Sequence, residues 1–262
     1  MTNALRIAAT GMAAQQTRVD TIANNIANMS TTAYAPRRAA FADLMYRQEL
    51  TPGAVSSRTG TLVPGGIQIG LGVRTAAVTA DRVQGTLTST GADLDVAIEG
   101  RGFFDVELPS GEIAYTRDGR FSLDPQGTLV NTDGFPVSGG ITVPEDARGV
   151  SITNDGEVYA LFSDGTGGQL IGTLGLTVFA NEKGLEALGG NLFRETEASG
   201  APGGGVAGVE GAGFMRQGYL EDSGVDVVSE IAELIEAQRG YELNSKVLTA
   251  ADEMYAAATR IK

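Results

Sequence analysis

Apolar residues recur at intervals of seven at both ends of the chain, and this periodicity constrains the fold more than any other feature. The N-terminal row holds Leu5, Met12, Val19 and Ile26, and the C-terminal row holds Val227, Leu234, Tyr241, Leu248 and Tyr255. The second rows are Ala8, Gln15, Ile22 and Met29, and the weaker Glu230, Ala237, Asn244, Ala251 and Ala258. Rows spaced three and four residues apart are typical of helices that wrap around one another. We therefore expect helices over residues 3–29 and 222–262 to pair as a coiled coil.

The polar face of the first predicted helix is unusual because it carries few charges. Apart from Arg6, Arg18 and Asp20 it consists of Gln15, Gln16, Thr17, Thr21, Asn24, Asn25 and Asn28. A helix face in water normally carries Lys and Glu. Amides and hydroxyls can be buried at lower cost than charges if they find hydrogen-bond partners. We favour a helix packed on several sides within an assembly over a merely polar helix face.

Between the terminal helices the sequence predicts β-structure. Pro36 follows the first helix, and residues 51–66 hold prolines, glycines and few large apolar side chains, which indicates an extended excursion. Alternation over residues 73–78 and 94–98 indicates strands, and turn residues within 121–130 and 150–159 indicate two hairpins. The glycine-rich stretch 192–213 is predicted to be a loop.

The predicted fold class is therefore α+β, with an all-β middle domain inserted between paired terminal helices. The expected division is residues 1–33 for the N-terminal helix, 34–66 for an extended linker, 67–220 for the β-rich domain and 221–262 for the C-terminal helix. Ser223 to Asp226 resembles a capping box for the last helix. Gly240 lies inside that helix and indicates either sequence drift or close approach of a neighbouring backbone.

Composition excludes several classes of function. The net charge is −13, so the surface repels phosphate backbones and no nucleic-acid partner is expected. The chain has no histidine and no cysteine, which excludes the commonest general base, most zinc sites and disulfides. No run approaches the roughly 18 apolar residues that span a bilayer, so no membrane insertion is expected. Without a cleavable signal at its start, the sequence by itself predicts a cytoplasmic protein.

No motif in the sequence indicates catalysis, a cofactor or a metal. Asp124, Asp133, Asp155 and Asp164 lie near glycines, a pattern that favours hairpin turns over calcium loops. Asp93 and Asp95 alternate onto one face of a strand, and such pairs are more often a solvated edge than a glycosidase site. We expect neither an enzyme nor a cofactor-binding protein.

Three blocks of residues resemble the signatures of bacterial flagellar rod and hook proteins. The first runs from Ile22 to Asn28 with Ser30 and Thr31. The second comprises residues 95–104 followed by 115–119, and the third comprises residues 233–246. The blocks lie in the family's order along essentially the whole chain. Within this family the chain is most similar to the distal-rod members, because it has a single middle domain and an insert at residues 46–66. It departs from the family at Ala33, Ala35 and Gly240, where glycine, lysine and alanine are usual.

The resemblance implies a structural subunit that polymerises helically into the distal rod of the flagellar basal body and transmits motor torque to the hook. It also implies export by the flagellar type III apparatus without a cleaved signal, to a location between periplasm and outer membrane. The implied partners are further copies of the chain, other rod and hook proteins, and surrounding ring proteins. The insert is associated in this family with keeping the rod straight.

We expect two groups of residues to act in assembly. Subunit packing is assigned to Leu5, Met12, Val19, Ile22, Ile26, Val227, Ile231, Leu234, Tyr241, Leu248 and Tyr255. The excursion between subunits is assigned to Tyr46, Pro52, Gly53, Ser56, Ser57 and Pro64. Because the helices bury too little surface to offset the entropy of ordering them, we predict that both termini are disordered in the lone monomer. The alternatives are a proximal-rod or hook subunit, an exported glycan-binding adhesin and, with little support, a peptidoglycan hydrolase.

Overall fold

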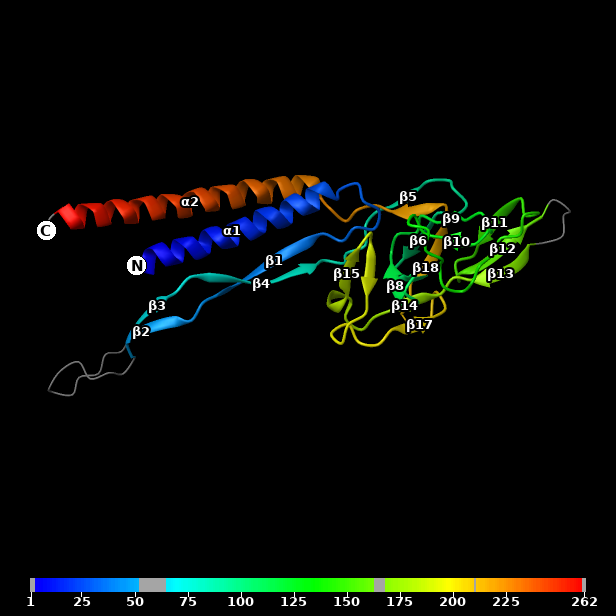
Figure 1. The fold of residues 1–262 in the computed structure, drawn as a ribbon, viewed down its shortest axis with the longest axis horizontal. Helices are drawn as coiled ribbons and strands as arrows, with labels where there is room; N and C mark the ends of the chain where they lie inside the picture. The colour runs from blue at the N-terminus through cyan, green and yellow to red at the C-terminus, as the bar shows by residue number, and fades with distance from the viewer. Residues whose placement is uncertain (1–2, 52–64, 163–167, 210, 261–262) are drawn as a thin grey trace. The chain divides into compact units, whose positions relative to one another are not determined.

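The structure, a computed structural model, describes residues 3–51, 65–162, 168–209 and 211–260. The chain forms two compact units. The first comprises Met1–Ala27, Arg37–Ala80 and Asp226–Lys262, and the second comprises Asn28–Pro36 and Asp81–Val225. Helices at both ends and a β-rich middle confirm the predicted α+β class (Figure 1).

The first unit consists of two long helices and a β-ribbon. Helix α1 spans Asn3–Ala27 and helix α2 spans Val227–Arg260, and the two lie side by side in opposite directions (Figure 1). Strand β1 (Arg37–Asp43) pairs antiparallel with β4 (Val73–Ala80), and β2 (Tyr46–Leu50) pairs with β3 (Ile67–Gly70). Strands β1 and β4 contact α1, so the ribbon and the helices form one unit.

The ribbon divides the chain differently from the sequence-based domains. We assigned residues 34–66 to an extended linker and began the middle domain at residue 67, but β3 and β4 pair with β2 and β1 inside the first unit. Alternation over 73–78 does mark a strand, as predicted. Its pairing partner comes from the other side of the insert, and periodicity carries no information about which strand pairs with which.

Helix α2 begins later than the predicted capping box. The side chain of Asp226, not that of Ser223, accepts hydrogen bonds from the first backbone N–H groups, those of Val228 at 3.1 Å and Ser229 at 3.4 Å. The Ser223 hydroxyl instead accepts from the backbone N–H of Val225 at 3.4 Å. Asp226 satisfies otherwise unpaired donors and places a negative charge at the positive end of the helix, which makes it the better cap.

The second unit is built from short antiparallel strands. They are β5 (Leu87–Ser89), β6 (Val96–Glu99), β7 (Phe104–Glu107), β8 (Ile113–Thr116), β9 (Ser122–Leu123), β10 (Leu129–Val130), β11 (Gly149–Ile152), β12 (Glu157–Leu161), β13 (Gln169–Thr173), β14 (Leu176–Val178), β15 (Glu186–Gly189), β16 (Leu192–Arg194), β17 (Gly203–Gly205), β18 (Phe214–Gln217) and β19 (Tyr219–Glu221). Larger sheets have the orders β15-β16-β8-β7 and β11-β12-β13. The other strands form pairs: β10–β9, β14–β17, β18–β6 and β19–β5.

Large apolar side chains fill the interior of the second unit. One cluster of buried residues includes Val96, Ile98, Phe104, Leu176 and Met215. A second, smaller cluster is aromatic and packs edge to face: the ring centre of Phe179 lies 5.9 Å from that of Phe103 and 4.8 Å from that of Tyr115. Edge-to-face rings add to the stability that burial provides. The second unit therefore has a hydrophobic core of its own.

Both predicted hairpins are present. Strands β9 and β10 pair across the turn at Asp124, whose carboxylate accepts hydrogen bonds from the backbone N–H groups of Gln126 and Thr128 at 2.9 and 2.7 Å. Strands β11 and β12 pair across the second turn. Gly127 and Gly156 have φ values of 80° and 88°, which glycine adopts without a steric penalty. These contacts support turns, rather than calcium loops, at the described aspartates; Asp164 lies outside the described residues.

The prediction of a loop over residues 192–213 is wrong for two segments. Leu192–Arg194 forms β16, and Gly203–Gly205 forms β17, which pairs with β14. A strand made of glycine has no side chains, so the alternation of apolar and polar residues that predicts a strand is absent from it. Pairing to β14 supplies the backbone hydrogen bonds that define it, and a Cβ at Gly203 would lie 3.3 Å from the carbonyl oxygen of Val178.

The segment after α1 has an unusual backbone at Ala33. Its φ is +54°, in the left-handed region that non-glycine residues rarely adopt. Ala33 is one of the positions where this sequence departs from the resembled family, which usually has glycine there. Its backbone N–H donates to the carbonyl oxygen of Glu221 at 2.8 Å, and this contact helps to hold the strained conformation.

Candidate subunit-packing surface

Small and polar residues, together with Ile22, are the buried ones on the two paired helices. The buried residues of α1 are Ala8, Ala14, Ile22 and Asn25, and in α2 the buried ones include Glu230, Ala237 and Ala251. On α2 these belong to the weaker of the two rows recognised in the sequence. Small residues let two helices approach closely, which leaves larger side chains at the margins of the contact.

The structure separates the predicted packing residues into three groups. Ile22 is buried, with 3% of its surface exposed. The half-buried group comprises Leu5, Met12, Val19, Ile26, Val227, Leu234 and Leu248. Ile231, Tyr241 and Tyr255 are exposed to 47%, 43% and 43%. Most of the predicted row therefore keeps apolar surface that the partner helix does not cover.

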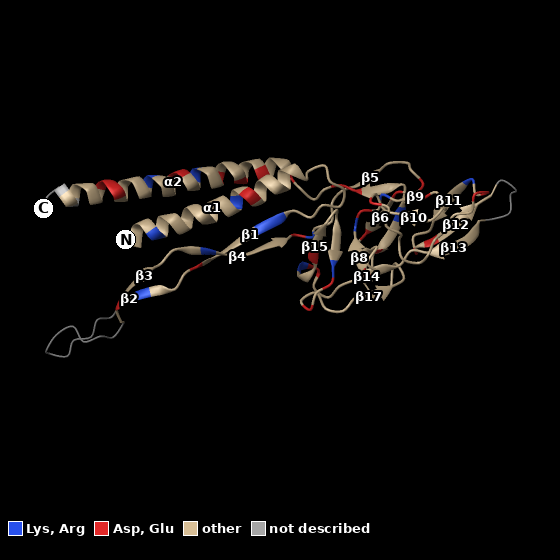
Figure 2. Ribbon diagram, viewed as in Figure 1, with Lys and Arg blue, Asp and Glu red and all other residues tan. Residues whose placement is uncertain are grey.

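Further large apolar residues of α2 are exposed and were missed by counting in sevens. They are Val228, Ile235, Leu243, Val247 and Met254. They lie outside the predicted row, so that apolar side chains occur around much of the helix. Helix α1 also carries few charges for its length, whereas α2 carries charges of both signs along it (Figure 2). A helix that is apolar on most sides is normally buried on most sides. The spread of apolar residues around α2 was the sequence feature that could have identified these additional residues.

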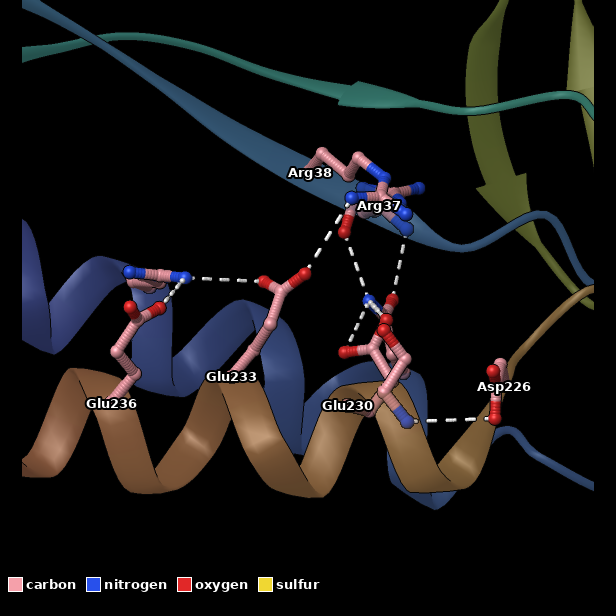
Figure 3. A network of polar contacts seen from close by, with 9 residues as sticks. Arg37, Arg38, Asp226, Glu230, Glu233 and Glu236 are labelled. Carbon is pink, nitrogen blue, oxygen red and sulfur yellow. Dashed lines mark hydrogen bonds and ion pairs between the residues drawn. The ribbon is translucent and has the colours of Figure 1, made fainter.

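A polar network joins α1, β1 and α2 at one end of the helix pair (Figure 3). The side-chain amide of Asn25, only 1% exposed, donates to the carbonyl oxygen of Arg37 at 2.9 Å and to the carboxylate of Glu230 at 3.1 Å, and its oxygen accepts from the Arg37 N–H at 2.8 Å. The side-chain amide of Asn25 thus bonds both the N–H and the C=O of Arg37, as the backbone of a neighbouring strand would. Replacing Asn25 would leave the buried carboxylate of Glu230 and the Arg37 backbone without these hydrogen bonds.

Charged side chains extend this network along the helices. Arg18 of α1 contacts Glu233 at 3.4 Å and Glu236 at 3.0 Å on α2, and Arg38 of β1 lies 3.6 Å from Glu233 (Figure 3). All these side chains are partly exposed, and such ion pairs contribute little each. These ion pairs mainly help to position α1, β1 and α2, because they link all three elements at one end of the helix pair.

The polar face of α1 is partly satisfied within the subunit. The hydroxyls of Thr17 and Thr21 donate to backbone carbonyls one turn earlier, at 3.1 and 2.7 Å, and Gln16 donates to Asp20 at 3.0 Å. Asn25 is buried against Arg37 and Glu230. The prediction that this face meets other chains stays a prediction for the remaining amides.

The ribbon exposes apolar residues on the approach to the predicted excursion. Tyr46 is 56% exposed, Met45 is 84% exposed, and Ile67 on the returning strand is 51% exposed. Pro52, Gly53, Ser56, Ser57 and Pro64 lie outside the described residues. A two-stranded ribbon alone is marginally stable in water, so its exposed apolar residues favour contact with another surface.

A buried ion pair lies in the second unit between Arg117 and Glu221. The guanidinium of Arg117 donates to Glu221 Oε2 at 2.8 and 3.0 Å, and the two side chains are 11% and 6% exposed. The second oxygen of Glu221 accepts from the backbone N–H of Gly85 at 2.9 Å, and its carbonyl accepts from that of Ala33 at 2.8 Å. Arg117 belongs to the second resembled block, so this pair ties that block to β19 and, through Glu221, to the segments that hold Gly85 and Ala33.

A half-buried carboxylate of the second unit, that of Asp105, is only half satisfied. Asp105 Oδ2 accepts a hydrogen bond from the Thr177 hydroxyl at 2.9 Å, whereas Oδ1 is buried without a partner among the described residues. Burial raises the pKa of Asp105, and the hydrogen bond from Thr177 opposes that shift. Burial, with the nearby carboxylates of Glu195 and Asp105, also raises the pKa of Tyr115 to about 12. These shifts follow from packing in the core.

The described residues contain no group of three or more acidic side chains that could hold a metal ion. The carboxylate of Asp95 accepts from the Thr90 hydroxyl at 2.6 Å, which gives it a structural partner. Among the described helices, none is long and apolar enough to cross a membrane.

The chain combines terminal helices that leave apolar side chains exposed with a β-rich unit inserted between them. Three family models match the chain in this order. The "Flagella basal body rod protein" model matches residues 5–34, the "Flagellar hook protein FlgE/F/G D1 domain" model residues 97–160, and the "Flagellar basal body rod FlgEFG protein C-terminal" model residues 216–261.

Relatives cover almost the whole chain. The chain is 49% identical to the flagellar basal-body rod protein FlgG of Agrobacterium fabrum over 96% of both chains, and 48% identical to that of Caulobacter vibrioides over 99% of both. It is 35% identical to the basal-body rod protein FlgF of Caulobacter vibrioides over 95% of this chain. The chain belongs to the FlgG family of flagellar basal-body rod proteins. It is therefore a structural protein of the flagellar rod.

Proposed function

We propose that this protein polymerises helically into the distal rod of the flagellar basal body and transmits motor torque to the hook. One observation carries the proposal: α2 leaves large apolar side chains, among them Ile231, Ile235 and Leu243, 47–63% exposed after it has packed against α1. Apolar surface contributes roughly 25 cal/mol per Å² when it is removed from water. Contact with further copies of the chain is the arrangement that covers this surface.

The terminal helices pair as a coiled coil in this proposal. Asn25 contacts Glu230, and a side-chain atom on Gly11 would meet Asn244. The two contacts lie fourteen residues apart on α1 and fourteen on α2, which is two heptads on each helix. Matched heptad steps on antiparallel helices support the coiled coil. The pairs then pack against those of neighbouring subunits to form an inner tube.

The insert at residues 46–66 bridges adjacent subunits and keeps the rod straight. Support comes from exposed Tyr46 and Met45 on the strand side that leads into it. The partners are other copies, neighbouring rod and hook proteins and the surrounding rings, and the chain reaches them by type III export without a cleaved signal. The termini order on assembly, since the helices gain most of their buried apolar surface only there.

Negative-stain electron microscopy of the purified full-length chain tests the proposal. We expect straight tubes, and curved tubes after deletion of residues 46–66. A chain that stays monomeric at high concentration, with sharp and dispersed NMR signals from residues 5–29, would contradict both polymerisation and the ordering of the termini on assembly.

A further inference from the structure

Each terminal helix contains a single glycine, and each glycine faces an amide side chain of the other helix. A Cβ atom placed on Gly11 of α1 would lie 2.8 Å from Oδ1 and 3.0 Å from Cγ of Asn244 on α2. A Cβ on Gly240 of α2 would lie 3.1 Å from Cδ and 3.2 Å from Nε2 of Gln15 on α1. These contacts are reciprocal, and they are four residues apart on both helices.

The amide of Asn244 cannot move away freely. Its Nδ2 donates to the carbonyl oxygen of Gly240 in its own helix at 2.8 Å, which directs Oδ1 toward Gly11. Gln15 is held less firmly, because its Oε1 is buried without a hydrogen-bond partner among the described residues. Substituting Gly11 therefore forces a larger rearrangement than substituting Gly240.

A heptad pattern alone does not fix how far one helix slides along another. Sliding by seven residues restores the same apolar rows, so the registers differ little in apolar burial. In this pair, a slip of one heptad would place Asn244 opposite Ala4 or Arg18, and Gln15 opposite Glu233 or Val247. Each amide would then meet a side chain in place of a glycine. The observed register is the one that accommodates both amides.

We propose that the reciprocal contacts Gly11–Asn244 and Gly240–Gln15 set the register of the α1–α2 pair. A buried amide that is accommodated in one register and excluded from others is an established way to specify a coiled coil. This inference concerns pairing within one subunit, and it holds whether the two helices order in the single chain or only on assembly. It also accounts for Gly240, for which sequence alone left two explanations open: the close approach is that of a side chain, Gln15, and not of a backbone.

Distances between spin labels test the register in the full-length chain. Ala23→Cys and Ala250→Cys place labels at exposed positions well separated along the helix pair, and the natural chain has no cysteine to interfere. A slip of seven residues changes their separation by about 10 Å, at ~1.5 Å per residue. The distance is measured by double electron–electron resonance in solution and in filaments diluted with unlabelled chain.

We expect a single distance in the labelled chain and, after the combined substitution Gly11→Ala with Gly240→Ala, a shift of about 10 Å or a second distance of that offset. The exchanged pair Gly11→Asn with Asn244→Gly should keep the original distance, because each amide still faces a glycine. Each single alanine variant should populate the second distance less than the double variant does, and Gly240→Ala least. Thr249→Ala, at an exposed position of α2, is the matched control and should change nothing.

The alanine substitutions are not expected to unfold the helices, because alanine favours helix over glycine. Far-UV circular dichroism measures the helix content of each variant directly. The inference is overturned if Gly11→Ala combined with Gly240→Ala keeps the single original distance, if the exchanged pair does not keep it, or if the labelled chain shows no single distance in either state. A chain that keeps its register yet forms no tubes would leave this inference standing and contradict the proposed function.

Discussion

In the second unit, Phe103, Phe104 and Phe179 have no exposed surface, whereas in the first unit Ile231, Tyr241 and Tyr255 each expose more than two fifths of theirs. The second unit closes its strands over large apolar side chains. The first unit uses mostly alanine, glycine and amides where its helices meet, and apart from Ile22 its large apolar residues keep exposed surface. The difference indicates that the second unit is stabilised by its own core, while the first leaves apolar surface available for the proposed contacts between subunits.

The largest expected effect on the stability of the single chain comes from the core of the second unit. Phe104 is fully buried, and its ring centre lies 5.1 Å from that of Phe121. Phe104→Ala should lower the free energy of unfolding by about 3–5 kcal/mol, measured by urea denaturation followed by near-UV circular dichroism. Phe214→Ala, at a position that is 51% exposed, should lower it by less than about 1.5 kcal/mol. Equal losses would contradict the distinction between core and surface.

Glu221→Gln should have the next largest effect. It leaves the guanidinium of Arg117 buried without its ion-pair partner, and breaking a buried pair in this way costs about 3 kcal/mol. The matched control is Glu186→Gln, because the Glu186–Arg194 pair is 53% and 44% exposed and should contribute less than about 1 kcal/mol. If the two variants unfold at the same urea concentration, the Arg117 pair does not hold the unit together.

Asp105→Asn should stabilise the second unit at neutral pH by about 1 kcal/mol, since it removes a buried charge with one unsatisfied oxygen. Burial raises the folded-state pKa of Asp105 above the unfolded value. Its contribution to stability is therefore fully present below the unfolded pKa and lost as the pH rises through the folded pKa. The gain from the substitution should shrink as the pH falls toward the usual aspartate pKa. Thermal unfolding at several pH values measures it, and a gain independent of pH would rule out this cause.

Ala33→Gly should raise stability by roughly 0.5–1 kcal/mol. Glycine adopts the left-handed backbone at φ +54° without a steric penalty, which stabilises the folded state by about 1–2 kcal/mol. The greater conformational freedom of glycine in the unfolded chain opposes part of this stabilisation. Ala35→Gly, two residues away with no positive φ, is the control and should destabilise slightly. A loss of stability in Ala33→Gly would mean that the strain is already relaxed in solution.

The smallest effect on the single chain is expected for Ile235→Ser on α2, within about 0.5 kcal/mol, because the side chain is already 47% exposed. Its effect on assembly should be large. Losing an apolar contact of about 1.5–3 kcal/mol raises the concentration needed for tube formation roughly tenfold or more. Sedimentation of the polymer measures this, with the exposed polar change Gln238→Ser as control. Unchanged assembly would place Ile235 outside any subunit contact.

Much of this architecture could be predicted from the sequence, because local patterns have local causes. Heptad spacing located both helices to within a few residues, and turn residues around Asp124 located the hairpin of β9 and β10. The all-glycine strand β17 was missed, since glycine leaves no pattern, and Ser223 was chosen as the cap where Asp226 serves. The packing prediction named Tyr241 and Tyr255 but not Leu243 or Met254, which lie on other faces of the same helix.

The sequence by itself determined that the ends of this chain are helical and that its middle is β-rich, because periodicity and turn chemistry act over a few residues. Its resemblance to flagellar rod proteins came from three signature blocks, not from those patterns. Only the tertiary structure decided that Asn25 pairs with Arg37 and Glu230, that β1 pairs with β4, and that Gly11 and Gly240 each meet an amide. Those contacts join residues far apart in the chain, and a repeating heptad is compatible with several registers until particular side chains have been brought together.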